Sequence, residues 1–265
     1  GEALAATGRY NEAITEFGKA GQTNQAVVKL RADLRRAETL LDIGKEEEAQ
    51  PVFQSFVAYY NAKNPRTAEE LTLIGRALTH LEKYKDANEM YLDATQADPT
   101  FIEAHLSGGE LYTEKYNYAD AAKFFADALK INPNSARAHV GVAANKRLEG
   151  GAEMGAAIDK ALAVNPNSVE AKTMRAGMML EAEKFEEAKA DIDAALKINP
   201  NSLDAHALRA VMFYLQDKSA ELDAEIKATL AINPRYGMLY ETLSHYATNN
   251  RRYANAAEFS RKAIE

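Results

Sequence analysis

The sequence predicts an all-α protein, a solenoid of stacked antiparallel helix pairs, and three observations support this fold class. An Asn-Pro or Asp-Pro dipeptide recurs every 33 or 34 residues. Two amphipathic helical patterns lie between successive prolines. The chain of 265 residues has no cysteine, so disulfides cannot hold its short helix pairs together. A pair of this length buries too little surface to fold alone, and neighbouring pairs must therefore cover each other.

The prolines set the repeat and end its helices. Proline lacks an amide proton and moves the preceding residue out of the helical region. A serine two positions after three of these prolines can accept an orphan amide proton where the next helix begins. Six of the seven prolines mark the period, namely Pro65, Pro99, Pro133, Pro166, Pro200 and Pro234.

The stretch between Pro99 and Pro133 shows what fills one period. Apolar residues at intervals of three and four predict a first helix over about residues 102–115 and a second over about 118–131. Small residues, such as Gly75 and Gly109, recur where the two helices of a pair cross. They allow the helix axes to come within the usual distance of about 8–10 Å.

Residues from Ala68 onward resemble a tetratricopeptide repeat, whose pattern is Trp-x2-Leu-Gly-x2-Tyr, then Ala-x3-Phe, then Pro. Several repeats fit at one period, and the resemblance extends over nearly the whole chain. It implies a right-handed superhelix that acts as a protein-binding scaffold without catalytic activity. In the repeat from Ala68, the positions of the pattern are taken by Leu71, Ile74, Gly75, Leu78, Ala87, Tyr91 and Pro99.

The domain organisation is predicted to be one solenoid over residues 1–265. The incomplete repeats at both ends are interpreted as the cut ends of a longer protein. Before the regular part, an irregular pair is expected, with helices over about 22–43 and 46–60. The parts are a partial repeat at 1–20, the irregular long pair at 21–64, regular repeats at 68–236 and a partial repeat at 237–265.

The fifth repeat, 136–168, is predicted to be the weakest. It is one residue shorter than its neighbours, and glycine costs a helix up to about 1 kcal/mol per site relative to alanine. We expect its second helix, about 152–164, to be the softest part of the solenoid and a candidate hinge, although a merely shortened turn is an equally simple explanation. The glycines of this repeat are Gly141, Gly150, Gly151 and Gly155.

The sequence contains no recognisable catalytic motif, and we predict that the chain is not an enzyme and binds no cofactor. Without cysteine, thiol catalysis and thiolate metal sites are excluded. His105, His139 and His206 occupy the same position in three repeats. Equivalent atoms of stacked repeats lie too far apart to share one metal ion, so these histidines are interpreted as packing residues and no metal site is predicted.

The composition restricts the classes of partner. The net charge is −7, and no Lys- or Arg-rich patch is present, so nucleic acid is not expected as a partner. No apolar run is long enough to insert into a membrane. No targeting segment is visible, and the compartment is left open. A protein or peptide is the expected partner, and self-association remains an alternative.

The resemblance places the binding site on the face formed by the first helix of each pair. Residues that are not needed for packing within a pair are expected there, with an apolar centre and polar rims, as is usual for protein interfaces. A helix or an extended peptide would suit such a groove. The predicted site residues are Arg76, Leu106, Glu110, Val140, Ala144, Met174, Gly177, Ala207, Val211, Tyr214, Glu241 and His245.

Some members of the family bind the C-terminal carboxylate of chaperones with lysine and asparagine side chains on this face. Those side chains are missing at the corresponding positions, such as Arg76, Glu110 and Ala144. Chaperone tails are therefore not expected to bind. Two alternatives to an interaction scaffold stay open: an accessory or regulatory segment of a larger enzyme whose catalytic domain lies outside this chain, and a self-assembly module.

Overall fold

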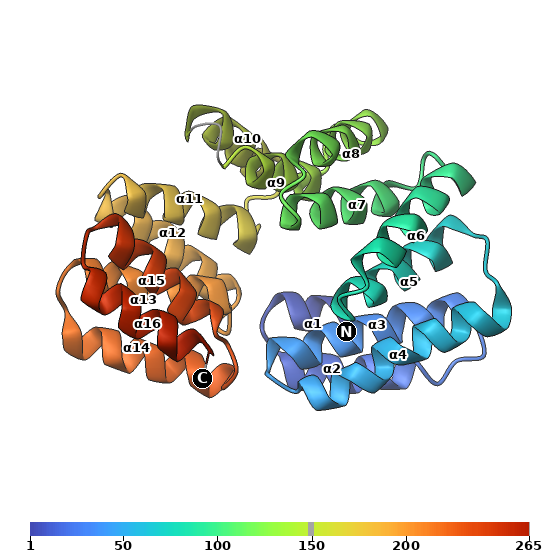
Figure 1. Cartoon of the computed structure of the whole chain (residues 1–265), viewed down its shortest axis with the longest axis horizontal. Helices are drawn as coiled ribbons and strands as arrows, with labels where there is room; N and C mark the ends of the chain where they lie inside the picture. The colour runs from blue at the N-terminus through green and yellow to red at the C-terminus, as the bar shows by residue number, and fades with distance from the viewer. Residues whose placement is uncertain (148–150, 265) are drawn as a thin grey trace. The chain divides into compact units, whose positions relative to one another are not determined.

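A computed structural model describes residues 1–147 and 151–264, and within them it contains sixteen α-helices and no strand (Figure 1). The all-α prediction is confirmed. In chain order the helices are α1 (Glu2–Ala6), α2 (Tyr10–Ala20), α3 (Ala26–Asp42), α4 (Glu46–Lys63), α5 (Ala68–His80), α6 (Tyr84–Ala97), α7 (Ile102–Glu114), α8 (Tyr118–Ile131), α9 (Ala136–Asn145), α10 (Gly151–Val164), α11 (Val169–Glu181), α12 (Phe185–Ile198), α13 (Leu203–Leu215), α14 (Ser219–Ile232), α15 (Met238–Asn249) and α16 (Tyr253–Ile264).

The helix limits agree with the sequence pattern where the repeat is regular. Helices α7 and α8 end within one residue of the predicted limits. The irregular pair differs more. Helix α3 begins at Ala26, because the preceding residues form a turn in which the Gln25 amide donates to the Thr23 hydroxyl. Helix α4 continues to Lys63 and ends at Asn64, which has a left-handed φ of 46°.

Hydroxyl caps hold the starts of several first helices. The Ser135 side chain accepts a hydrogen bond from the Ala138 amide, and Ser168 and Ser202 make the same bond three residues ahead. Each cap satisfies one of the amide protons that a helix start leaves without a partner. The predicted role of the serines after the prolines is confirmed.

The chain divides into two compact units. Unit 1 comprises residues 1–2, 11–41 and 45–166, and unit 2 comprises residues 3–10, 42–44 and 167–265. The main boundary follows Pro166, the proline near the end of the fifth repeat. Gly150 lies outside the described residues, and the predicted softness of this repeat stays a prediction, as does the single solenoid over 1–265.

From α5 onward, the two helices of a pair make the most extensive contacts, as between α5 and α6 or α11 and α12. Large side chains fill the space that small residues leave. The clearest case is Phe125 of α8, which is 1% exposed. A Cβ atom added at Gly109 or Gly141 would lie 2.7 Å or 2.2 Å from Phe125 Cε1, so both positions need glycine.

The turn between the two helices of a pair contains a residue with positive φ. Gly8 and Gly44 occupy this position in the first two pairs. Residues with a side chain occupy it in most of the later pairs, where the left-handed conformation costs about 1–2 kcal/mol relative to the right-handed one. These residues are Glu82, Tyr116, Glu183, Asp217 and Arg251, with φ values between 55° and 60°.

We expect Glu82→Gly to stabilise unit 1 by about 1 kcal/mol, because glycine adopts positive φ without strain. Glu82 is exposed and has φ 58°. Urea denaturation followed by circular dichroism measures the change. Glu82→Ala is the matched control, since it removes the same side chain and keeps the strained Cβ. Equal stabilities of the glycine and alanine variants would contradict the argument.

Candidate functional site

The first helices of successive pairs form a common face in each unit. In unit 1, α7 contacts both α5 and α9, and in unit 2, α13 contacts both α11 and α15. In the described parts of the chain, the second helices of successive pairs make at most marginal contacts with one another. The first helices thus lie closer together, and we call the surface that they present the first-helix face.

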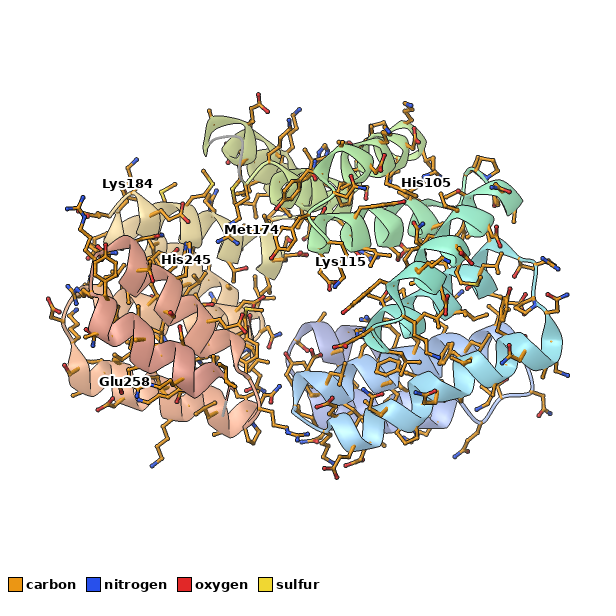
Figure 2. The ribbon with its side chains drawn as sticks, in the orientation of Figure 1. His105, Lys115, Met174, Lys184, His245 and Glu258 are labelled. Atoms are coloured by element: carbon orange, nitrogen blue, oxygen red, sulfur yellow. The ribbon has the colours of Figure 1, made fainter. Side chains whose placement is uncertain are left out.

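The structure divides the predicted site residues into two groups. Seven of them stay at least partly accessible. Arg76, Ala144, Met174 and Gly177 are partly buried, and Glu110, Glu241 and His245 are exposed. Met174 on α11 and His245 on α15 are labelled in Figure 2. The other five are buried to 6% exposure or less, namely Leu106, Val140, Ala207, Val211 and Tyr214.

The prediction of an accessible apolar centre is therefore wrong for those five residues. Leu106 lies in a core cluster with Phe125, and Val211 and Tyr214 lie in the core of unit 2. They stabilise the contacts between first helices, which are closer than the sequence pattern suggested. Side chains buried in this way cannot contact a partner without unfolding the repeat.

Tyr246 takes part in the core that buries the predicted site residues of unit 2. It belongs to α15, is 5% exposed, and lies in the same core cluster as Val211. Its hydroxyl donates to the carbonyl oxygen of Gly177 on α11 at 3.1 Å. Because α13 contacts both of these helices, the Tyr246 side chain links the repeats on its two sides. This tyrosine covers surface that was expected to be open.

Ion pairs occupy the first-helix face of unit 1. Glu38 of α3 accepts from Arg76 of α5 at 2.7 Å and from Arg35 at 2.8 Å, and His80 lies 3.5 Å away. Burial alone would raise the pKa of the Glu38 carboxyl. The hydrogen bond from His80 and the charges of Arg76 and Arg35 outweigh it and lower the pKa to about 2. Glu38 is therefore ionised at neutral pH.

A second set of ion pairs connects α7 with α9. Arg137 donates to both oxygens of Glu110, at 2.7 Å and 2.6 Å, and to Glu103 at 2.6 Å. Burial would lower the pKa of Arg137, but the two carboxylates outweigh it and raise the pKa. Arg76 and Glu110 were predicted to contact a partner, and both are already paired within the fold. A ligand at these positions would have to displace an internal ion pair.

Unit 2 has a pocket of ≈ 530 Å³ at the C-terminal ends of its first helices. Leu180 and Leu215 contribute apolar surface, and Tyr246 lies beside them. The polar part of the lining comes from Glu181, Glu183, Asn249, Asn250 and Arg252.

The charges at this pocket favour a basic partner. Arg252 is paired with Asp217 at 2.7 Å. Glu181 and Glu183 are exposed, and neither forms an ion pair with any residue that the structure describes. Two unpaired carboxylates next to apolar side chains would attract a segment that carries lysine or arginine beside an apolar residue.

The pocket lies one helical turn beyond the predicted residues. Glu181 follows Gly177 by four positions on α11, and Asn249 follows His245 by four on α15. Residues four apart lie on the same side of a helix. The predicted residues Gly177 and His245 therefore lie on the same side of their helices as the pocket-lining residues Glu181 and Asn249, one turn before them. The pocket needs the ends of three helices, which no single repeat reveals.

The three histidines at one repeat position have a structural role. Nε2 of His105 lies 2.9 Å from the carbonyl oxygen of Pro99, six residues earlier, and donates its proton there. His139 and His206 make the same bond, to Pro133 at 3.0 Å and to Pro200 at 2.9 Å. Each histidine thus ties its helix to the preceding turn. The packing interpretation of this row is supported by these contacts.

The described residues contain neither a metal-binding cluster nor a helix that could span a membrane. No three or more His, Asp or Glu side chains are placed so that they could hold a metal ion. None of the described helices has the length and apolar character that crossing a bilayer requires.

Comparisons with known proteins identify the repeat. The family model described as "Tetratricopeptide repeat" matches residues 34–100 and 74–136. No curated protein matches the sequence.

Solved structures share the fold. A tetratricopeptide-repeat protein from Parabacteroides merdae has a TM-score of 0.66 and 17% identity over 93% of this chain and 99% of its own. A thermophilic tetratricopeptide-repeat protein from Thermus thermophilus has a TM-score of 0.59 and 22% identity over 70% of this chain and 99% of its own. A chain of the APC/C hetero-tetramer Cut9–Hcn1 has a TM-score of 0.72 and 10% identity over 100% of this chain and 54% of its own. Identities this low show the fold alone.

The predicted resemblance is confirmed: residues 34–136 match the tetratricopeptide-repeat family model, and the solved structures show that the chain shares the fold of tetratricopeptide-repeat proteins.

Proposed function

We propose that this protein is a non-enzymatic interaction scaffold that binds a peptide segment or helix of another protein at the pocket of unit 2. Proteins of this family generally act as scaffolds for protein partners. The observation that carries the more specific proposal is the pocket itself. It combines Leu180 and Leu215 with the unpaired carboxylates of Glu181 and Glu183.

The proposed ligand has one apolar side chain flanked by lysine or arginine. An apolar anchor that enters a pocket, surrounded by polar contacts, is the usual arrangement at protein interfaces. The volume of ≈ 530 Å³ is within the range that holds a few side chains. The Cut9–Hcn1 chain, which has a similar fold, comes from a hetero-tetramer, and this supports a partner protein as the ligand.

A peptide library tests the proposal. We expect displayed peptides selected on the full 265-residue chain to be enriched in lysine and arginine next to an apolar residue. Fluorescence anisotropy then measures the affinity of the selected peptides. Glu181→Lys combined with Asn249→Lys should weaken binding at least about tenfold, since like charges repel at the pocket.

The matched control places the same charge elsewhere. Glu187 is exposed on α12 and is not among the residues that line the pocket. Glu187→Lys should leave the affinity unchanged. If selection yields no peptide, or if the two pocket substitutions have no more effect than Glu187→Lys, the proposed site is wrong.

A further inference from the structure

Two positions face each other in several of the helix pairs, and their side chains are matched in chemical character. They lie eight residues before and eight residues after the turn residue with positive φ. In α5–α6 they are Ile74 and Met90, and in α15–α16 they are Leu243 and Phe259, all of them buried. We call them the facing positions.

Two pairs of unit 2 carry an arginine and an acid at the facing positions. Arg175 of α11 donates from Nε and Nη2 to the two oxygens of Asp191 on α12, both at 2.7 Å. In α13–α14, Arg209 Nε lies 2.8 Å from Glu225 Oε2, an ion pair in which this nitrogen, although buried, does not meet hydrogen-bond geometry. Burial would raise the pKa of Glu225, but bonds from His206 and Arg209 lower it. An arginine on the first helix is thus matched by a carboxylate on the second.

The pair α3–α4 in unit 1 breaks this match. Its facing positions are Arg36, eight residues before Gly44, and Val52, eight residues after it. Arg36 makes no hydrogen bond or ion pair with any described residue, and its Nε is buried without a partner. A buried donor without a hydrogen-bond partner lowers the stability of the fold by about 1–3 kcal/mol, and by more when the donor belongs to a charged group.

A pocket of ≈ 430 Å³ opens at this position, and both Arg36 and Val52 line it. Lys29 and Asp33 also line it, and they are paired with each other at 2.8 Å. The charges of Lys29 and Asp33 cancel, so the residues that line the pocket carry a net charge of one, and this positive charge is on Arg36. A single positive charge matches a carboxylate, whereas the Asp33 carboxylate would repel a phosphate that carries two negative charges.

We infer that this pocket is a binding site for a carboxylate from an aspartate or glutamate side chain of a protein partner. The carboxylate takes the place beside Arg36 that Asp191 and Glu225 hold beside their own arginines. A carboxylate can accept the two parallel N–H bonds of a guanidinium, as Asp191 does. The inference rests on the proposed function in one respect only, namely that the carboxylate belongs to a protein partner.

Nuclear magnetic resonance of the ¹⁵N-labelled full chain tests the site with small probes. N-acetyl-glutamate amide supplies one side-chain carboxylate. We expect it to shift the Arg36 Nε–Hε resonance in a saturable manner, and the resonance is assigned by its loss in Arg36→Leu. This substitution should not unfold the repeat, since Ile74 and Leu243 hold the same position in other pairs. N-acetyl-glutamine amide should cause no saturable shift.

Val52→Glu supplies the missing carboxylate from within the chain. We expect the Arg36 resonance of this variant to be shifted before any probe is added, and its affinity for N-acetyl-glutamate amide to fall at least tenfold. Val52→Ala is the matched control, because it leaves the pocket open and adds no charge. Its affinity should stay within about twofold of the original chain.

Several outcomes would overturn the inference. One is that the glutamine probe shifts the Arg36 resonance as much as the glutamate probe does. Another is that Val52→Glu binds the glutamate probe with the same affinity as the original chain. If inorganic phosphate binds more tightly than N-acetyl-glutamate amide, the ligand is not a carboxylate. If N-acetyl-alanine, which carries only an α-carboxylate, binds more tightly than N-acetyl-glutamate amide, the carboxylate does not come from a side chain. The probes act at unit 1 without any peptide, so failure here is distinguishable from failure of the peptide selection at unit 2.

Discussion

Glu38→Gln is expected to lower the free energy of unfolding by about 3 kcal/mol at pH 7, because a pKa held roughly 2.5 units below its ordinary value corresponds to stabilisation of that size. The side chain of Glu38 is 14% exposed and lies between Arg35 and Arg76. Glutamine keeps the shape and removes the charge. It leaves the partly buried guanidinium of Arg76 without its carboxylate, while Arg35 keeps its pair with Glu2, and removal of one partner from a buried ion pair is among the costliest single changes.

The effect depends on pH in a definite direction. The pKa of Glu38 is about 2 in the folded chain, compared with an ordinary value of 4.5. Its contribution is therefore fully present well above pH 4.5 and is lost as the pH falls through about 2, below which the carboxyl is protonated in both the folded and the unfolded state. The difference between the original chain and Glu38→Gln should shrink progressively over that range in urea denaturation experiments.

The Arg31–Glu69 pair provides the control. It also connects α3 with α5, but the Arg31 side chain is 59% exposed, so solvent screens the interaction. Glu69→Gln should cost less than about 1 kcal/mol. Equal losses for Glu38→Gln and Glu69→Gln, or a loss for Glu38→Gln that does not decrease at low pH, would contradict the proposed cause.

The helices could be predicted from the sequence because their information is local. Apolar spacing, serine caps and prolines specify α7 and α8 within one residue. The limits of α3 were less predictable, since the Thr23 turn depends on a single hydroxyl bond. The left-handed turns at Glu82 and Tyr116 were missed, because no glycine marks them in these pairs.

The candidate site was only partly predictable, because its openness depends on contacts between repeats. Val211 and Leu106 belong to the first-helix face by spacing, yet neighbouring helices bury them. The bond from Tyr246 to Gly177 joins residues 69 positions apart, which no local pattern contains. The pairing of Arg76 with Glu38 is likewise invisible in one repeat. Comparison of the facing positions across repeats could have found Arg36, since Asp191 and Glu225 have no counterpart at Val52.

Phe125→Ala is expected to destabilise unit 1 by about 3–5 kcal/mol, the usual cost of removing a fully buried phenylalanine side chain. The ring is 1% exposed and lies against glycines on two helices, Gly109 of α7 and Gly141 of α9. Because glycine has no side chain that can move into the space, the cavity collapses poorly, and the loss should be near the upper end of this range. Chemical denaturation measures the change.

The substitution Gly141→Ala then distinguishes packing from helix propensity. In the original chain, its Cβ would lie 2.2 Å from Phe125 Cε1, so we expect a loss of about 1–3 kcal/mol even though alanine favours helices. In the Phe125→Ala background the same methyl group enters the cavity, and the substitution should stabilise the chain by up to about 1 kcal/mol. Gly177→Ala is the control in α11, where the nearest atom outside the helix is 3.7 Å away and alanine should be stabilising in both backgrounds. A loss at Gly141 that persists without the Phe125 ring would show that strain in α9 itself, and not the ring, requires glycine there.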